Sequence, residues 1–177
     1  DGTYHGLDGA AVERICADFG DDYWLLKDSE GGFPHDFHAA FAKAGWLGIA
    51  MPEEFGGAGL GITEAAIMMQ AIAQSGAGFS GASAIHMNIF GLHPVVRFGT
   101  DEQKRRFLPP LIAGADRACF AVTEPDAGLN TLRLKTRAVR EGDRYVITGQ
   151  KIWTSTAQIA NKVLMLVRTT PIEEVAK

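Results

Sequence analysis

The feature that most constrains the fold is a change in hydrophobic pattern near residues 114–118 of this 177-residue chain. Before it, apolar residues recur at intervals of three and four, as they do along one face of a helix. After it, β-branched and aromatic residues gather in short runs between turns. We therefore expect an α+β chain with an all-α N-terminal domain at 1–116 and a β domain at 117–177.

The first part of the helical region shows three helix signals. Apolar residues within 11–19 repeat with helical spacing. Pro34 can open a second helix at its first turn, and Gly45 can end it. Residues 65–73 are almost continuously apolar, which indicates a helix buried between others.

Two further helical stretches precede the boundary. The apolar stretch over 85–98 contains Pro94, which should kink or restart the helix. Thr100 or Asp101 can cap the last helix, which we expect to end near Pro109–Pro110 because proline removes a backbone donor and clashes with the preceding turn.

The region after the boundary predicts four short strands, with a hairpin turn at 141–143. Four such strands leave an open edge and an uncovered apolar face, so we expect the β-sandwich to be partial and the natural protein to continue beyond this chain. The runs are 119–123, 134–139, 145–148 and 163–169.

Composition argues against several classes of function. The net charge is −4, so the overall field does not favour binding to nucleic acid, and the basic run Lys104–Arg106 is expected to be a solvated helix face. No apolar stretch approaches the roughly 20 residues of a membrane span. Cys16 and Cys119 are isolated, which favours a reducing compartment over a disulfide framework.

Two candidate sites are weak. The glycine-rich run at 56–61 lacks the spacing and the preceding strand of a dinucleotide-binding loop, so we interpret it as a tight turn before a helix capped near Thr63. His35 and His38 share a helix face, but nothing nearby supplies a third ligand. We therefore expect no metal site.

The strongest functional signal is a pair of segments about 30 residues apart, Phe120–Gly128 and Gly149–Ser155. Each sets an apolar or aromatic stretch beside small hydroxyl residues. A planar ring with polar edges, such as a flavin, needs an apolar face to lie on and donors around its rim. Either segment alone fits a strand that ends in a turn, and it is the pair that indicates a flavin site.

With two further motifs, the chain resembles the acyl-CoA dehydrogenase family over essentially its whole length. The further motifs are Met51–Gly57 with Gly59, and Phe98–Lys104. The resemblance implies a helical N-terminal domain, then a β-sandwich domain, then a C-terminal four-helix bundle that is absent from these residues. Because the family's catalytic carboxylate lies in that bundle, no catalytic residue is expected in this chain.

The resemblance also implies flavin adenine dinucleotide (FAD) as the cofactor. Carried over position by position, Phe120, Val122 and Thr123 are expected to hold one edge of the isoalloxazine ring, and Gly128 continues that segment.

The second segment is expected to supply the other contacts, with Trp153 packing on the ring and Thr154 and Ser155 reaching its reactive nitrogen. Leu129 stands where many family members carry a serine that contacts the thioester arm of acyl-CoA. We therefore expect Leu129 to alter the substrate pocket, and Phe90 is a second candidate that could line it.

The implied activity is α,β-dehydrogenation of an acyl-CoA thioester, in which hydride passes to flavin N5 and electrons pass on to an electron-transfer flavoprotein. A homo-oligomer, dimer or tetramer, is expected in the cytoplasm of a bacterium or in a mitochondrial matrix. The alternatives are an acyl-CoA oxidase or flavin monooxygenase of the same fold, or a non-catalytic flavin- or acyl-binding homologue. The sequence leaves the length and branching of the acyl chain open.

Overall fold

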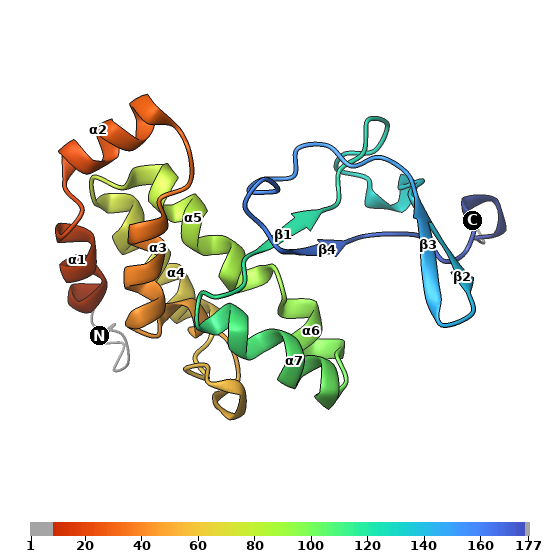
Figure 1. Cartoon of the computed structure of the whole chain (residues 1–177), viewed down its shortest axis with the longest axis horizontal. Coiled ribbons are helices and arrows are strands. Elements are labelled where there is room, and N and C mark those ends of the chain that lie inside the picture. The colour runs from red at the N-terminus through yellow and green to blue at the C-terminus, as the bar shows by residue number, and fades with distance from the viewer. Residues whose placement is uncertain (1–8, 176–177) are drawn as a thin grey trace. The chain divides into compact units, whose positions relative to one another are not determined.

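The computed structural model describes residues 9–175 and divides into two compact units, residues 1–118 and 119–177. The first unit is helical and the second is built from short strands (Figure 1). The expected α+β class is therefore confirmed. The helices are α1 Gly9–Ala17, α2 Asp21–Glu30, α3 His35–Lys43, α4 Ile62–Gln74, α5 Gly78–Phe90, α6 His93–Phe98 and α7 Asp101–Ile112.

The main core of the helical unit is formed where α1 and α3 pack against the helix pair α4 and α5 (Figure 1). Several of its large side chains are fully excluded from solvent. The prediction that α4 is buried between other helices is wrong, because the helix buries one face while Ala66 and Ala73 on the other are exposed. A second cluster joins α7 to the loop that precedes α4. Representative core residues are Phe37, Phe41, Met68, Ile72 and Ile85.

Several local signals act as the sequence predicted. Gly45 follows α3 in the left-handed conformation, with φ of 82°, which suits a residue without Cβ. Thr100 caps α7 by accepting a hydrogen bond from the amide of Gln103, while the Gln103 side chain accepts from the amide of Thr100. Pro94 lies in the first turn of α6, so the helical stretch restarts there after α5 ends at Phe90.

The prediction that α7 ends at Pro109–Pro110 is wrong, because the helix continues to Ile112. The two prolines remove the donors that would reach the carbonyls of Arg105 and Arg106, but both arginines lie on the exposed side, where water can satisfy those carbonyls. Burial of Leu111 on the opposite side favours the continued helix.

Two other differences concern helix starts. Helix α2 carries no periodic apolar signal in the sequence, since charged residues dominate it and Trp24 alone among its side chains is buried. Helix α4 begins at Ile62 after Gly61, earlier than the expected cap near Thr63, because the Glu64 carboxylate accepts a hydrogen bond from the Gly61 amide at 2.8 Å.

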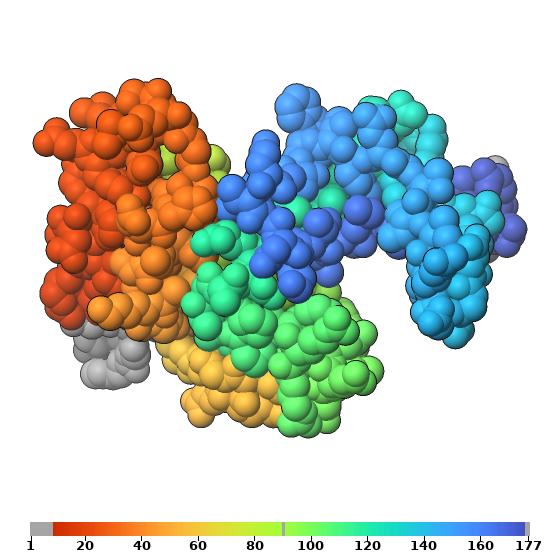
Figure 2. Space-filling view, viewed as in Figure 1, coloured from red at the N-terminus to blue at the C-terminus, as the bar shows by residue number. Residues whose placement is uncertain are grey.

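The β unit contains two small sheets. Strand β1 (Ala118–Ala121) pairs with β4 (Lys162–Met165), and β2 (Arg137–Glu141) pairs antiparallel with β3 (Arg144–Thr148). The expected turn at 141–143 joins β2 to β3. Every residue of β3 is exposed, and the hairpin projects from the rest of its unit (Figure 2).

Over residues 9–175, none of the helices combines the length and the apolar character that crossing a membrane requires.

Candidate functional site

The two segments that carry the flavin signal lie side by side in the β unit. The Ile152 amide donates a hydrogen bond to the carbonyl of Thr123 at 2.9 Å. The Lys151 ammonium donates to the carbonyl of Val122 at 2.8 Å. Residues separated by 29 positions are thus joined through two consecutive carbonyls of the first segment, which fixes the start of the second segment against it.

A buried ion pair lies at this junction. The Glu124 side chain is 5% exposed and the Lys151 side chain 7% exposed, and their charged atoms are 2.9 Å apart. The carboxylate also accepts from two consecutive backbone amides, that of Lys135 at 2.6 Å and that of Thr136 at 2.9 Å. Each carboxylate oxygen therefore has a backbone donor, and one of them also binds the ammonium.

These donors decide the charge of Glu124. Burial raises the pKa of a carboxyl group, but hydrogen bonds from Thr136, Lys135 and Lys151 outweigh it and lower the pKa of Glu124 from 4.5 to about 2. The carboxylate is therefore ionised at neutral pH. It remains stable inside the unit because its charge is both paired and hydrogen-bonded.

A tight turn follows Glu124. Glu124 and Ala127 exchange two backbone hydrogen bonds, of 2.9 and 3.1 Å, so that Pro125 and Asp126 form the tip. The Asp126 carboxylate pairs with the Lys135 ammonium at 2.8 Å in solvent. After the turn, Gly128 is exposed, and a Cβ there would meet no protein atom within 4 Å. The chain itself does not require glycine for space at this position, which leaves room for another molecule to approach the backbone.

Trp153 has an unusual conformation. Its φ is 57°, in the left-handed region that bulky residues rarely adopt, and its side chain is 85% exposed. An exposed indole on a strained backbone is a pattern that clusters at functional sites. The next two residues present hydroxyl groups, from half-buried Thr154 and exposed Ser155. A broad apolar face thus lies directly beside small hydrogen-bonding groups.

The remaining predicted residues are placed as follows. Phe120 is half-buried in β1, and Val122 and Thr123 are half-buried directly after it. Leu129 is fully exposed, at 106%, so it does not pack against the sheet within the described residues. Phe90 ends α5, and its side chain lies outside the described part of the structure.

The residues present fit a flavin. Its ring needs an apolar surface, which the exposed Trp153 side chain offers, and hydrogen-bonding groups at its edge, which Thr123, Thr154 and Ser155 carry. Close approach of a ligand to the chain needs a position without a side chain, which Gly128 provides.

Sequence reasoning missed the roles of Glu124 and Lys151. Their signal was nevertheless available, since Lys151 is the one charged residue of Gly149–Ser155 and Glu124 directly follows the uncharged run 118–123. A charge set in a run that becomes buried needs a partner. Two such charges of opposite sign, one in each of two segments expected to meet, could have been paired from the sequence.

The two weak candidates of the sequence do not form sites within residues 9–175. The run at 56–61 folds back through hydrogen bonds to 48–53, as a tight turn. His38 is buried and lies 3.4 Å from the Asn88 side chain, whereas His35 is exposed. No cluster of three or more metal-ligating His, Cys, Asp or Glu side chains occurs in that described range.

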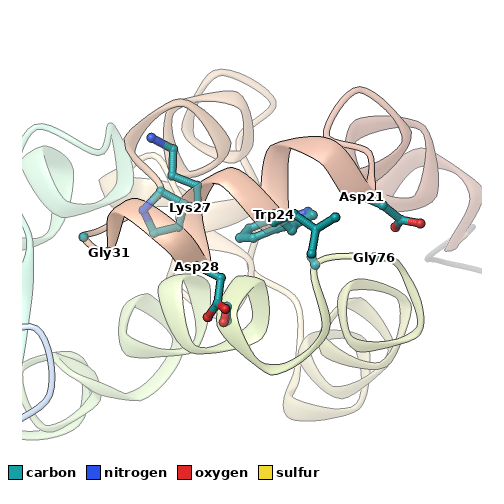
Figure 3. Close-up of a pocket in the computed structure, with 11 residues that line it drawn as sticks. Asp21, Trp24, Lys27, Asp28, Gly31 and Gly76 are labelled. Carbon is teal, nitrogen blue, oxygen red and sulfur yellow. The ribbon is translucent and has the colours of Figure 1, made fainter.

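A cavity of about 580 Å³ lies in the helical unit, between α2 and the turn that joins α4 to α5 (Figure 3). Asp21, Trp24 and Asp28 project from α2 toward this space, and Gly76 lies in the turn. The Trp24 indole N–H is already bonded to the carbonyl of Phe19 at 2.9 Å. None of the residues expected to bind cofactor or substrate lines this cavity.

Comparison with known proteins identifies the same two parts. Residues 10–115 match the model of the acyl-CoA dehydrogenase N-terminal domain, and residues 119–176 match that of the acyl-CoA dehydrogenase middle domain. The acyl-CoA dehydrogenase FadE12 of Mycobacterium tuberculosis is 36% identical over 162 residues, which are 90% of this chain and 40% of that protein.

Solved structures agree. A probable acyl-CoA dehydrogenase from Mycobacterium abscessus has a TM-score of 0.76 and 32% identity, over 90% of this chain and 43% of that one. The FAD complex of PigA has a TM-score of 0.85 and 25% identity, over 92% of this chain and 43% of that one. The chain thus spans about two fifths of the length of the relatives it matches. On its sequence and its fold, it belongs to the acyl-CoA dehydrogenase family.

Proposed function

We propose that the protein of which this chain is part is an FAD-dependent dehydrogenase of acyl-CoA thioesters. The observation that carries the proposal is the hydrogen-bonded union of the Val122–Glu124 and Lys151–Ile152 segments, which sets Trp153 and its neighbouring hydroxyls on a fixed frame. Bound FAD would accept the hydride from the β-carbon of the acyl group. Family membership and the FAD complex of a structural neighbour support this cofactor.

In this proposal the role of the chain is to bind the flavin and to orient its ring. Phe120, Val122 and Thr123 hold one edge of the ring, Gly128 allows close approach, and the second segment covers a face of the ring and donates to it. The base that takes the α-proton comes from elsewhere in the protein. We further propose that the boundary between the two domains lies at 116/117 and that an electron-transfer flavoprotein accepts the electrons from the reduced flavin. The enzyme is proposed to be a homo-oligomer of fatty acid metabolism that works in bacterial cytoplasm or in the mitochondrial matrix.

The cofactor can be tested directly. The purified full-length protein is expected to be yellow and to release FAD, and not FMN or NAD, on denaturation. Absorbance spectroscopy and chromatography of the released cofactor decide this. A colourless protein that cannot be reconstituted with FAD would refute the proposed function.

Ser155 tests the electronic role of the second segment. A hydroxyl donor near flavin N5 should stabilise the negative charge of the reduced ring, so Ser155→Ala should lower the flavin reduction potential and slow reduction by substrate. Potentiometry and stopped-flow reduction of the FAD-loaded variant measure both. An unchanged potential and rate would assign Ser155 another role. Thr170→Ala, which removes an exposed hydroxyl outside both segments, is the control.

Leu129 tests substrate selection. Its full exposure leaves its apolar side chain available to a bound acyl thioester. Gain or loss of one such contact is worth about 1–3 kcal/mol, so Leu129→Ser should change the ratios of kcat/KM across a panel of acyl-CoA thioesters by about tenfold or more. The melting temperature should stay nearly constant. Equal scaling of every substrate together with a lower melting temperature would make Leu129 structural.

A further inference from the structure

The buried ion pair of Glu124 and Lys151 has no part in the hydride transfer proposed above. The Lys151 ammonium makes two hydrogen bonds, to the carbonyl of Val122 at 2.8 Å and to the carboxylate of Glu124 at 2.9 Å. Both partners belong to the first segment, and Lys151 lies in the second. A single cation therefore connects the two segments at the point where they meet.

Burying such a pair is an inefficient way to gain stability. Desolvation of two charges offsets much of their attraction, and apolar residues of similar volume often stabilise a fold as well or better. What a buried pair supplies in its place is a defined relative position, since each charge is costly to leave unpaired.

The carboxylate cannot be replaced by a neutral group of the same shape. One oxygen of Glu124 accepts from the Lys135 amide and the other from the Thr136 amide. A glutamine has a single acceptor oxygen, so its NH₂ group would face one of these amides donor to donor. The site thus requires a carboxylate, and the buried carboxylate in turn requires a cation.

Trp153 needs this frame because its own contacts do not hold it. Its side chain is 85% exposed, and its backbone lies in a region that costs energy for a bulky residue. Lys151 and Ile152, which directly precede it, are both bonded to the first segment. The position of the indole is therefore set by the backbone at 151–152.

We propose that Glu124 and Lys151 are a positioning pair for the flavin: they hold the second segment, Gly149–Ser155, so that Trp153 and the following hydroxyls lie where the ring binds. This inference rests on the proposed function. The pair does not touch the reacting atoms, and it acts through the backbone of 122–124 and 151–153.

The test compares Lys151→Met with Lys135→Met in the full-length protein. Each change removes one ammonium and keeps an apolar stem, but Lys151 is buried whereas the Lys135 pair with Asp126 is exposed, at 64% and 68%. Lys135→Met also leaves the backbone amide that reaches Glu124 intact. Three quantities are measured: the Kd for FAD, the flavin reduction potential at saturating FAD, and hydrogen exchange of the peptide containing Ile152.

Lys151→Met should raise the Kd for FAD by about tenfold or more, the range in which loss of an outer-shell partner weakens a bound group. It should also shift the potential and speed exchange at Ile152 about tenfold, whereas exchange in the β2–β3 hairpin stays unchanged. Lys135→Met should leave all of these within about twofold, as removal of an exposed pair does little. Lys151→Arg, which keeps the charge, should recover most of the lost affinity.

A folded Lys151→Met protein with native FAD affinity, potential and exchange would overturn the proposal, and so would equal effects of the two variants. A lowered melting temperature with a native potential would reduce the pair to a structural role and also overturn it. If Lys151→Met does not fold, Lys151→Gln, which removes the charge but keeps a donor for the buried carboxylate, replaces it with the same expectations. Failure of the unmodified protein to bind FAD would refute the proposed function, and exchange at Ile152 would then decide alone whether the pair positions the segment.

Discussion

Gly57→Ala is expected to destabilise the helical unit by about 3 kcal/mol, the range of severe overpacking. A Cβ at this position would overlap the carbonyl oxygen of Met51 and lie 2.5 Å from its carbonyl carbon. Both obstacles are backbone atoms, so no side-chain rotation can relieve the overlap. The loop must open for the variant to fold.

Opening this loop breaks a set of backbone hydrogen bonds. The amide of Ala58 donates to the carbonyl of Gly48 at 3.0 Å, and that of Gly59 to Met51 at 2.8 Å. Met51 itself is buried, at 2% exposure, in the cluster that α7 covers. The strain that an alanine introduces at position 57 therefore acts through Met51 on the packing of α7.

Denaturant unfolding followed by tryptophan fluorescence measures the effect, because Trp24 is buried in the helical unit. Gly20→Ala is the matched control: Gly20 has φ of −71°, and an added Cβ there would meet no atom within 4 Å. Its cost should stay below about 1 kcal/mol. Equal free energies of unfolding for the two variants would show that the crowding at Gly57 is relieved without cost.

The glycine-rich run shows which level of the fold the sequence encodes locally. Its spacing was enough to exclude a dinucleotide-binding loop and to predict a tight turn, since both depend on residues next to one another. The reason for Gly57 was not visible, because it depends on where the backbone of Met51 lies. The same limit explains α7, where exposure on one side and burial of Leu111 on the other outweigh the local effect of Pro109 and Pro110.

The candidate site likewise has features that the local sequence predicts and features that depend on the folded backbone. Residues that we propose as ligand contacts because they belong to a linear motif, such as Thr123 and Trp153, could be chosen from the sequence and from the family resemblance. The hydrogen bonds of Glu124 to the amides of Lys135 and Thr136 could not, because they join a turn to a segment 11 and 12 residues further along. The left-handed backbone of Trp153 likewise has no signal in its residue type.

The helical unit is expected to lose about 3 kcal/mol of stability as the pH falls from 6.5 to 4, through His38. This side chain is 2% exposed. Burial lowers its pKa, the hydrogen bond with Asn88 raises it, and the charge of Arg117 lowers it again, which leaves the pKa at about 4 instead of 6.5. Because Asn88 uses its NH₂ group to donate to the carbonyl of Leu111 at 3.2 Å, its oxygen faces His38 as an acceptor.

The sign follows from proton binding. Between pH 6.5 and 4 the unfolded chain protonates His38 and the folded chain does not, so falling pH favours unfolding. Above 6.5 neither state is protonated, and below 4 both are, so this contribution is flat on either side. A difference of 2.5 pKa units at about 1.4 kcal/mol per unit gives the expected loss of about 3 kcal/mol.

The window from pH 6.5 to 5 isolates this effect, because Glu124 contributes only as the pH falls from 4.5 toward 2. Denaturant unfolding of the helical unit should lose about 2 kcal/mol across that window in the unmodified protein. His38→Met should abolish the slope, whatever its effect on stability at pH 7. His35→Gln should keep it, because His35 is exposed although it lies one turn away. If the slope survives in His38→Met, another group causes it, and His38 does not govern the acid stability of the unit.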